Sequence, residues 1–390
     1  MAFDEGPTLE TRFEHACETA GALHRHWPLG HSYGGFTKAL TAATPQVGRA
    51  IARRLRRKLH DLAGSHWTVG RWRAFAGDGS RIETPHTAAN EVGLGCAGRD
   101  KTAPQVFLTT LWHLGLGVPW DFRLGPGTDS ERRHLEDMLD ELPARSLLVA
   151  DAGFVGFETC RRILAAGHSF LLRVGSNITL LTKLGYHHQE RDGLVYLWPQ
   201  THRSQEPLVL RLIKLTRGAQ TIYLLTNVLE PTDLTDQEAE KLYELRWGVE
   251  VFYRSYKQTL DRRKMLSRNP TNCLLEAQWT FLGVWLLALL TVQSLIRNGQ
   301  DPRRLSIAKA RDTVRRAMRR ASSCQPRRWN LQAGLRRAMQ DCHRRRGSKK
   351  ARNYPRKKRE KPPGPPIIKP ATLREIKRAA RLQKKLHPAA

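Results

Sequence analysis

Short apolar runs separated by turn residues occupy the first half of this chain after Trp67. Gly, Pro and Asp separate these runs, as is typical of strands. We expect strands at 72–76, 81–85, 105–112, 118–124, 146–150 and 169–174, and helices at 130–142 and 157–166. Strands linked by a crossover helix predict an α/β fold with a mixed sheet.

A second block of strand-like sequence follows at about 175–228. Its runs at 178–181, 193–198, 208–215 and 221–226 alternate with polar turns and contain no helix signal. We interpret this block as a β-subdomain inserted into the α/β core. After it, Thr235 and Glu238 form the pattern of a capping box, which predicts the start of a long helix.

The flanking regions are predicted to be mainly helical and basic. Residues 1–65 have helical periodicity and end in a run of five cations at 53–58, which is either a solvated surface or a DNA-contacting helix. Residues 277–296 contain no charge but are diluted by polar side chains, so we expect a buried core helix rather than a membrane span. Residues 301–346 predict basic helices. Residues 347–390 predict a disordered basic tail, with at most a transient helix near 373–386.

The charge of the chain indicates a polyanionic partner. The formal net charge is +30, and residues 341–390 hold 18 Lys and Arg against three acids, so half of the excess lies there. The body remains basic without this segment. Its mixed charge and the lack of an obvious basic amphipathic anchor helix favour nucleic acid over a membrane surface. Six cysteines at 17, 96, 160, 273, 324 and 342 stand singly, as expected of reduced thiols in a cytoplasmic protein.

The helix after the β-subdomain carries an unusual polar face. At about 100° per residue, four of its side chains share a stripe about 60° wide, and these are Tyr243, Arg246, Glu250 and Lys257. Apolar residues at 242, 245, 249, 252, 256 and 260 lie on the opposite side and predict burial. The polar stripe is either an ordinary solvated surface with i,i+4 ion pairs or a surface for a polyanion or metal.

Three acids occupy positions suited to chemistry. Asp78 lies at or just past the first strand, in Gly-Asp-Gly-Ser, and Asp151 directly follows the apolar strand 147–150. Glu250 is on the polar helix face. Ligand sites of α/β sheets gather at the carboxyl ends of strands. Each acid also has an ordinary interpretation: Asp78 as a turn residue, Asp151 as a helix cap, and Glu250 as the partner of Arg246 or Arg254.

Together these residues resemble the DDE transposases of the insertion-sequence-four type. The Y-x2-R-x3-E-x6-K spacing of the helix is similar to the signature of that family. The Asp-Gly-Ser at Asp78 and the Asp-x-Gly-Phe at Asp151 resemble its first two acidic motifs. The resemblance covers about residues 67–296, and it includes the long β-type segment between Asp151 and Glu250.

The resemblance implies a ribonuclease-H-like catalytic core at 66–300, interrupted by the β-subdomain, in which Asp78, Asp151 and Glu250 bind two Mg2+ ions, with Mn2+ as a substitute. Hard oxygen ligands suit these ions, and two of them can support an in-line phosphodiester displacement. Tyr243, Arg246, Arg254 and Lys257 would contact DNA phosphates. Trp198 is the candidate for an aromatic that stabilises a flipped base, or else a core aromatic.

The implied function is cut-and-paste transposition in a prokaryotic cytoplasm, at the nucleoid. The enzyme would cleave double-stranded DNA at terminal inverted repeats and join the 3′ ends to a target, as a homodimer on paired ends and with no membrane partner. Residues 1–65 would bind the element ends. A nuclease of the same fold without strand transfer and a catalytically inactive DNA-binding derivative are the alternatives.

Overall fold

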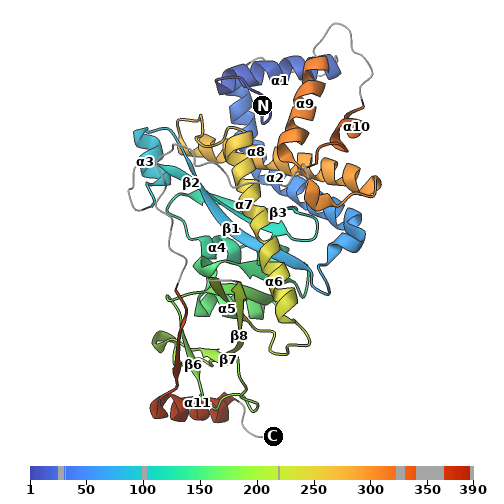
Figure 1. The fold of residues 1–390 in the computed structure, drawn as a ribbon. Helices are drawn as coiled ribbons and strands as arrows, with labels where there is room; N and C mark the ends of the chain where they lie inside the picture. The colour runs from blue at the N-terminus through green and yellow to red at the C-terminus, as the bar shows by residue number, and fades with distance from the viewer. Residues whose placement is uncertain are drawn as a thin grey trace. The chain divides into compact units, whose positions relative to one another are not determined.

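The computed structural model describes residues 1–24, 30, 32–98, 103–217, 220–321, 330–339 and 364–386. The chain divides into two compact units. Unit 1 contains Met1–Ser146 and Glu244–Met339, and unit 2 contains Leu147–Tyr243 and Gln340–Ala390. Figure 1 shows the elements of both. Each unit combines helices with β-strands, which confirms the predicted α/β class.

Unit 1 begins with the predicted helices. These are α1 (Leu9–Leu23), α2 (Tyr33–Ala63) and the 3-10 turn η1 (Gly64–Trp67). On α2, Arg53, Arg54, Arg57 and Lys58 are exposed, whereas Arg56 forms ion pairs with Asp121 at 3.1 Å and Glu141 at 2.5 Å. Most of the basic run therefore faces solvent, and one of its arginines attaches the helix to the rest of the unit.

An antiparallel sheet forms the centre of unit 1. Its strands are β1 (Ala74–Glu83), β2 (Gln105–His113) and β3 (Val118–Pro126), with β2 in the middle. Shorter helices surround them, namely α3 (Ala88–Leu94), α4 (Glu131–Glu136) and η2 (Leu139–Glu141). The single helix expected at 130–142 is thus two short pieces, because Asp137 and Met138 interrupt it.

The remaining helices of unit 1 come from its second segment. They are α7 (Trp247–Arg254), the π-helical turn η5 (Ser255–Thr259), α8 (Pro270–Arg297), η6 (Pro302–Arg304), α9 (Ile307–Ala321) and α10 (Leu331–Leu335). The predicted apolar side of α7 and η5 is buried at Val249, Phe252 and Tyr256, each at most 2% exposed.

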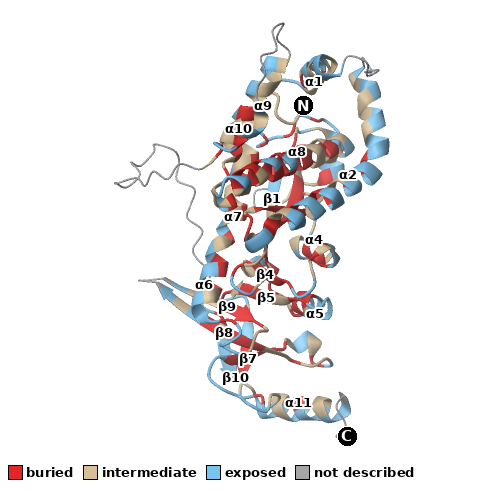
Figure 2. Ribbon diagram, turned by 90° about the vertical axis from the view of Figure 1, so that its right-hand side faces the viewer, coloured by how far each residue is buried: buried red, intermediate tan, exposed pale blue. Residues whose placement is uncertain are grey.

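Helix α8 is the apolar centre of unit 1. It packs on β2 and β3, where the ring of Phe281 stacks on Phe122 with centroids 4.2 Å apart. By length and composition α8 is long and apolar enough to cross a membrane, but 67% of its most apolar stretch is buried inside the protein. Figure 2 shows these buried residues along α8. The burial agrees with the predicted core helix.

Unit 2 contains a sheet in the order β4-β5-β9-β8-β7-β6-β10. The strands are β4 (Leu147–Ala150), β5 (Ser169–Val174), β6 (Thr179–Thr182), β7 (Leu194–Leu197), β8 (Leu208–Arg217), β9 (Gln220–Thr226) and β10 (Ile367–Pro370). The pairs β4–β5 and β6–β10 are parallel and the others between them antiparallel. Helical elements are η3 (Ala152–Phe154), α5 (Phe157–Ala165), η4 (Gln200–His202), α6 (Asp236–Leu245) and α11 (Leu373–Leu386).

The C-terminal region differs from the predicted disordered tail where the structure describes it. Residues 364–386 form β10 and the 14-residue helix α11. The prediction was wrong here because β10 is ordered by hydrogen bonds to a strand about 190 residues earlier, which local composition does not reveal. Residues 322–329, 340–363 and 387–390 of the predicted basic regions lie outside the described residues, as do Cys324 and Cys342.

Candidate active site

Asp78 lies inside strand β1 rather than at a turn. It is paired in register with Thr110 on β2, and the strand continues to Glu83. The turn interpretation was wrong, because Gly79 is required by the close approach of other side chains rather than by a turn. A Cβ on Gly79 would lie 2.8 Å from the ring of Phe107 and closer still to the carboxylate of Glu131. Glycine therefore permits these side chains to approach the strand beside Asp78.

The Asp78 carboxyl group is in a strongly unfavourable place for a negative charge. Its pKa is raised to about 7, mainly by burial and also by the charges of Glu131 and Glu250. The guanidinium of Arg246 and the backbone N–H of Gly79 act in the opposite direction. Unit 1 thus brings Asp78 and Glu250, two of the three predicted acids, into one electrostatic neighbourhood.

Glu250 is held by an arginine of the same polar stripe. The Nη2 atom of Arg246 donates to Oε1 of Glu250 at 2.8 Å, one helical turn away. The side chain of Arg246 is only 6% exposed, whereas that of Glu250 is 30% exposed. A phosphate-binding role would require an exposed Arg246. In the structure its side chain is buried and interacts with the carboxyl groups of Glu250 and Asp78.

Two residues that the sequence did not single out also contribute. The hydroxyl of Tyr253 donates to the backbone carbonyl of Asp78 at 2.7 Å, and burial raises the tyrosine pKa well above its usual value. Glu131, in the first turn of α4, adds a third carboxylate near Asp78. Two features of the sequence could have pointed to these residues: Tyr253 follows Glu250 by three positions, and the α4 segment is polar.

Asp151 occupies its predicted position at the carboxyl end of β4, in unit 2. Its side chain accepts a hydrogen bond from the N–H of Ala152 at 2.8 Å, so it also caps η3, as its ordinary interpretation expected. The hydroxyl of Tyr243 donates to Asp151 at 3.4 Å, and Arg173 lies 3.7 Å from the same oxygen. The carboxylate is 41% exposed. Tyr243 therefore contacts an acid rather than standing free on a helix face.

Arg254 and Lys257, the other two predicted DNA-contacting residues of this helix, differ in exposure. Arg254 is exposed at the end of α7, and Lys257 is half-buried in η5. In η5 the N–H of Leu260 bonds to the carbonyl of Ser255, five residues back, at 3.2 Å. This π-turn adds a residue relative to α-helical spacing, so the predicted stripe does not extend unchanged to Lys257.

Trp198 is buried within unit 2 and has no face open to a base. The residue is 1% exposed, and its indole N–H donates to the carbonyl of Gln205 at 2.8 Å. The guanidinium carbon of Arg203 lies over the ring, 4.3 Å from its centroid. These contacts correspond to the core-aromatic alternative.

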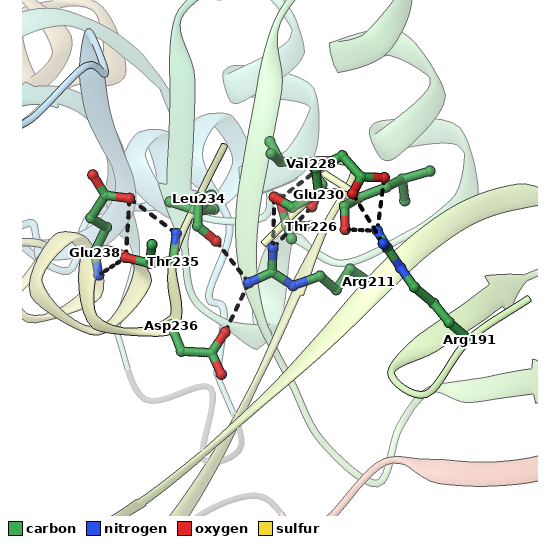
Figure 3. Close-up of polar contacts among 10 residues, drawn as sticks. Arg191, Arg211, Thr226, Val228, Glu230, Leu234, Thr235, Asp236 and Glu238 are labelled. Carbon is green, nitrogen blue, oxygen red and sulfur yellow. Dashed lines mark hydrogen bonds and ion pairs between the residues drawn. The ribbon is translucent and has the colours of Figure 1, made fainter. Parts of the chain in front are cut away.

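The start of α6, which leads along the chain to α7, is fixed by the β-subdomain. Figure 3 shows that Arg211 of β8 donates to the carbonyl of Leu234 and to the carboxylate of Asp236, both at 2.8 Å. Thr235 and Glu238 exchange the hydrogen bonds of a capping box, which confirms that prediction. Arg211 is 7% exposed, so the β-subdomain provides a buried anchor for the N-terminus of α6.

Charge rather than ligand geometry indicates that the site suits a cation. No group of three or more His, Cys, Asp or Glu side chains is arranged to hold one metal ion in the described part of the chain. Around Asp78, however, burial and two further carboxylates disfavour ionisation, and a divalent cation would relieve that cost. The donors are carboxylate oxygens, which suit Mg2+. The carboxylates near Asp78 are thus chemically suited to a hard divalent cation, although the described residues do not form a complete ligand set for one.

Several known proteins are similar to this chain. Transposase InsG for insertion sequence element IS4 from Escherichia coli (strain K12) is 26% identical over 310 residues, which are 74% of this chain and 69% of InsG. A protein of insertion sequence element IS4SA from Synechocystis sp. is 18% identical over 211 residues, 50% of this chain and 59% of that one. The piggyBac transposase, solved as a synaptic complex with hairpin DNA, matches with a TM-score of 0.41 and 11% identity over 69% of this chain and 58% of that chain.

A family model identifies the family of this chain. Residues 73–285, more than half of the chain, match the model described as Transposase DDE domain. The matched range contains Asp78, Asp151 and Glu250. Members of this family catalyse phosphoryl transfer. The chain belongs to the DDE transposase family and is distantly related to the transposases of IS4-type insertion elements.

Proposed function

We propose that this protein cleaves double-stranded DNA at the terminal inverted repeats of its own insertion element and transfers the freed 3′ ends into target DNA. The name of InsG, a transposase for element IS4, supports an element-specific role. The observation that carries the proposal is the charge cluster of Asp78, Glu250 and Arg246 inside the range that matches the DDE domain. We propose a ribonuclease-H-like core for this range.

Asp78, Asp151 and Glu250 are the proposed ligands of two divalent cations, Mg2+ or Mn2+. When bound, such ions supply activation of the attacking hydroxyl and stabilisation of the leaving oxygen. The chain's own residues fix the ligands. Tyr253 holds the β1 backbone at Asp78, Arg246 orients Glu250, and Tyr243 and Arg173 lie beside Asp151.

Arg246 has a second proposed role, which depends on its burial. Its guanidinium stabilises the ionised form of Asp78, which is the form that binds cations, and donates a hydrogen bond to the side chain of Glu250. The exposed Arg254 and the half-buried Lys257 are the proposed phosphate contacts of this region. Residues 1–65, with the exposed cations of α2, are proposed to contact the element ends.

A homodimer on paired ends, in a prokaryotic cytoplasm, completes the proposal. A cut in both strands followed by joining requires two active sites to act on two ends that are held together. Sedimentation of the protein with end DNA should give a dimer, whether or not the protein is already dimeric without DNA. A monomer on end DNA would contradict this part of the proposal.

A cleavage and joining assay tests the proposal. Purified protein is incubated with Mg2+ and a labelled duplex that carries the element end, beside Asp78→Asn, Asp151→Asn and Glu250→Gln. The wild type should cut and join, and each variant should bind the duplex but do neither. Cleavage without joining would identify a nuclease. If any one of the three variants cut normally, that acid would not be a metal ligand.

A further inference from the structure

The C-terminal segment of the described chain is docked on the β-subdomain of unit 2. Strand β10 pairs in parallel with β6, with Ile367 opposite Thr179. The N–H of Ile367 bonds to the carbonyl of Ile178 at 2.9 Å, and that of Ala371 to the carbonyl of Thr182 at 2.8 Å. Helix α11 follows directly, and it lies at the end of the sheet near β6 and β7 in Figure 1 and near β7 and β10 in Figure 2.

One face of α11 makes the contacts with the β-subdomain. Glu375 forms an ion pair with Arg203 at 2.5 Å, and Gln383 donates to the carbonyl of Tyr186 at 3.3 Å. Between them Ala379 is 1% exposed. These helix residues are spaced by four, so they lie on a single side of the helix.

The partner of Glu375 is built into the core of the β-subdomain. Arg203 has a side chain only 9% exposed, and its guanidinium carbon lies over the buried ring of Trp198. Trp198, Arg203 and Glu375 therefore form a stack that fixes the start of α11. This arrangement gives the buried tryptophan a structural role in presenting the helix.

The opposite face of α11 is uniformly cationic. All its Lys and Arg side chains are exposed, and they are Arg374, Lys377, Arg378, Arg381, Lys384 and Lys385. At about 100° and 1.5 Å per residue they fall within an arc of about 120° and a length of about 17 Å. The helix contains one acid, Glu375, and it is turned inward.

Repulsion among the cations on this face destabilises α11 when no polyanion is bound. Cations three and four residues apart repel each other on a helix surface, and a solvated helix normally relieves this with interspersed acids. Here the single available acid is used for docking. The apolar side faces unit 2, so α11 does not fit a membrane-surface helix, which would insert that side into lipid.

We propose that α11 is a binding surface for the phosphate backbone of duplex DNA, held in place on the β-subdomain by Trp198, Arg203 and Glu375. Six cations on one exposed face match a polyanion, and contacts of this kind position DNA without reading its sequence. The inference rests on the proposed function only for the choice of DNA among polyanions. It assigns a DNA-contacting surface outside residues 73–285, the range that matches the DDE domain.

The salt dependence of binding tests this surface. Full-length protein binds a random-sequence duplex of 30 base pairs in EDTA, so that neither the active site nor the element ends are involved. Neutralising Lys377, Arg381 and Lys384 to Gln should reduce the slope of log affinity against log salt by about 2.7 in magnitude, or about 0.9 per phosphate contact. Affinity at low salt should fall about 10-fold or more.

The matched control removes the same charge from other exposed positions of unit 2. Lys183→Gln, Lys214→Gln and Lys241→Gln together also remove three cations, but these are scattered over the unit. The control should change the slope by less than about 0.5. Equal slopes for the two triple variants would overturn the inference, because net charge alone would then account for the loss. Absence of binding to this duplex by the wild type would also overturn the inference, whereas the proposed function is tested separately by the cleavage and joining assay with Mg2+ and element ends.

Chemical labelling of the unchanged protein gives a second readout that does not depend on variant folding. An amine-reactive reagent modifies exposed lysines, and mass spectrometry compares the rates with and without the same duplex. Lys377, Lys384 and Lys385 should be protected at least about threefold by DNA, while Lys183 should react at the same rate. Unprotected α11 lysines at saturating DNA would show that the helix does not contact it.

Discussion

Helices α7 and α11 each hold a glutamate against a buried arginine, but the arginine comes from a different place in each case. For α7 it is Arg246, the residue directly before the helix, which bonds to Glu250 and acts electrostatically on Asp78. On α11, the buried arginine is Arg203 from the β-subdomain, and the helix's own cations all face solvent. The two helices also differ in composition, because α7 contains one cation and one acid, whereas α11 contains six cations and one acid.

The difference lies in what each ion pair leaves exposed. The pair on α7 leaves a partly exposed carboxylate beside the buried carboxyl of Asp78, a place where a cation would be stabilised. The pair on α11 removes the helix's single acid from the surface and leaves only positive charge, a place where a phosphate would be stabilised. One helix is therefore suited to chemistry and the other to holding the substrate.

Exchanging glutamate for glutamine on both helices should give the largest contrast. Glu250→Gln should reduce cleavage of an end-bearing duplex by about 10³-fold or more, because a proposed metal ligand is lost. Glu375→Gln also removes an arginine-paired carboxylate from a helix, but it should weaken duplex binding rather than the chemical step, so the rate at saturating DNA should stay within about threefold. Single-turnover rates at saturating DNA measure both. Similar losses in the two variants would mean that Glu250 acts only through folding.

Removing the two arginines should separate the helices by the pH dependence of stability. Arg246→Ala should lower the free energy of unfolding by about 2–4 kcal/mol at pH 8, although the 30% exposure of Glu250 limits the effect through solvent screening. Arg203→Ala should cost about 1–3 kcal/mol, from the ion pair and the contact with Trp198. Urea unfolding at several pH values measures both.

The two arginine variants should differ in how their loss of unfolding free energy depends on pH. For Arg246→Ala the loss should shrink toward pH 5, because Asp78 then takes up a proton and no longer needs the guanidinium. For Arg203→Ala it should be constant from pH 5 to 8, since the pKa of Glu375 is already lowered. A constant loss for Arg246→Ala would contradict the electrostatic link to Asp78.

Replacing Asp78 by Asn should stabilise the metal-free protein in a defined pH range. The folded pKa of about 7 lies above the unfolded value of 3.8, so folding favours the protonated carboxyl. The protonated carboxyl of Asp78 makes its full contribution to the free energy of unfolding below about pH 4, and this contribution is lost as the pH rises through about 7. Asp78→Asn should therefore raise Tm by about 2–5 °C at pH 8 in EDTA and leave it unchanged at pH 4. Differential scanning calorimetry measures this.

Mg2+ provides the control for the same variant. Adding millimolar Mg2+ should raise the Tm of the wild type at pH 8, because the cation binds the folded state. The Tm of Asp78→Asn should respond less. An equal response in both proteins would place the cation away from Asp78.

The sequence predicted those features that depend on neighbours along the chain. Strands β2 to β9, the position of Asp151 after β4 and the capping box of Thr235 and Glu238 all follow from local patterns, and each is observed. The two strands expected at 72–76 and 81–85 are instead the single strand β1. The buried character of α8 followed from its polar dilution. These signals need no knowledge of the tertiary structure.

Features set by distant partners could not be predicted. Gly79 resembled a turn residue, but it is required by Phe107 and Glu131, which approach from other elements. The buried Arg246 looked like a surface cation because helical periodicity gives its direction and not what covers it. The order of α11 depends on Arg203, 172 residues from Glu375. In each case the deciding contact lies outside any sequence window.

The smallest expected effect concerns the repulsion among the α11 cations themselves. Arg381 lies three or four residues from Lys377, Arg378, Lys384 and Lys385, and each like-charge pair costs about 0.2–0.5 kcal/mol at low salt. Arg381→Gln should therefore slow hydrogen exchange of the α11 amides a few-fold in 20 mM salt, and the difference should vanish in 0.5 M salt. Lys183→Gln should leave these amides unchanged. Faster exchange in Arg381→Gln would mean that this cation stabilises the helix, and the outward charge would then be structural rather than reserved for DNA.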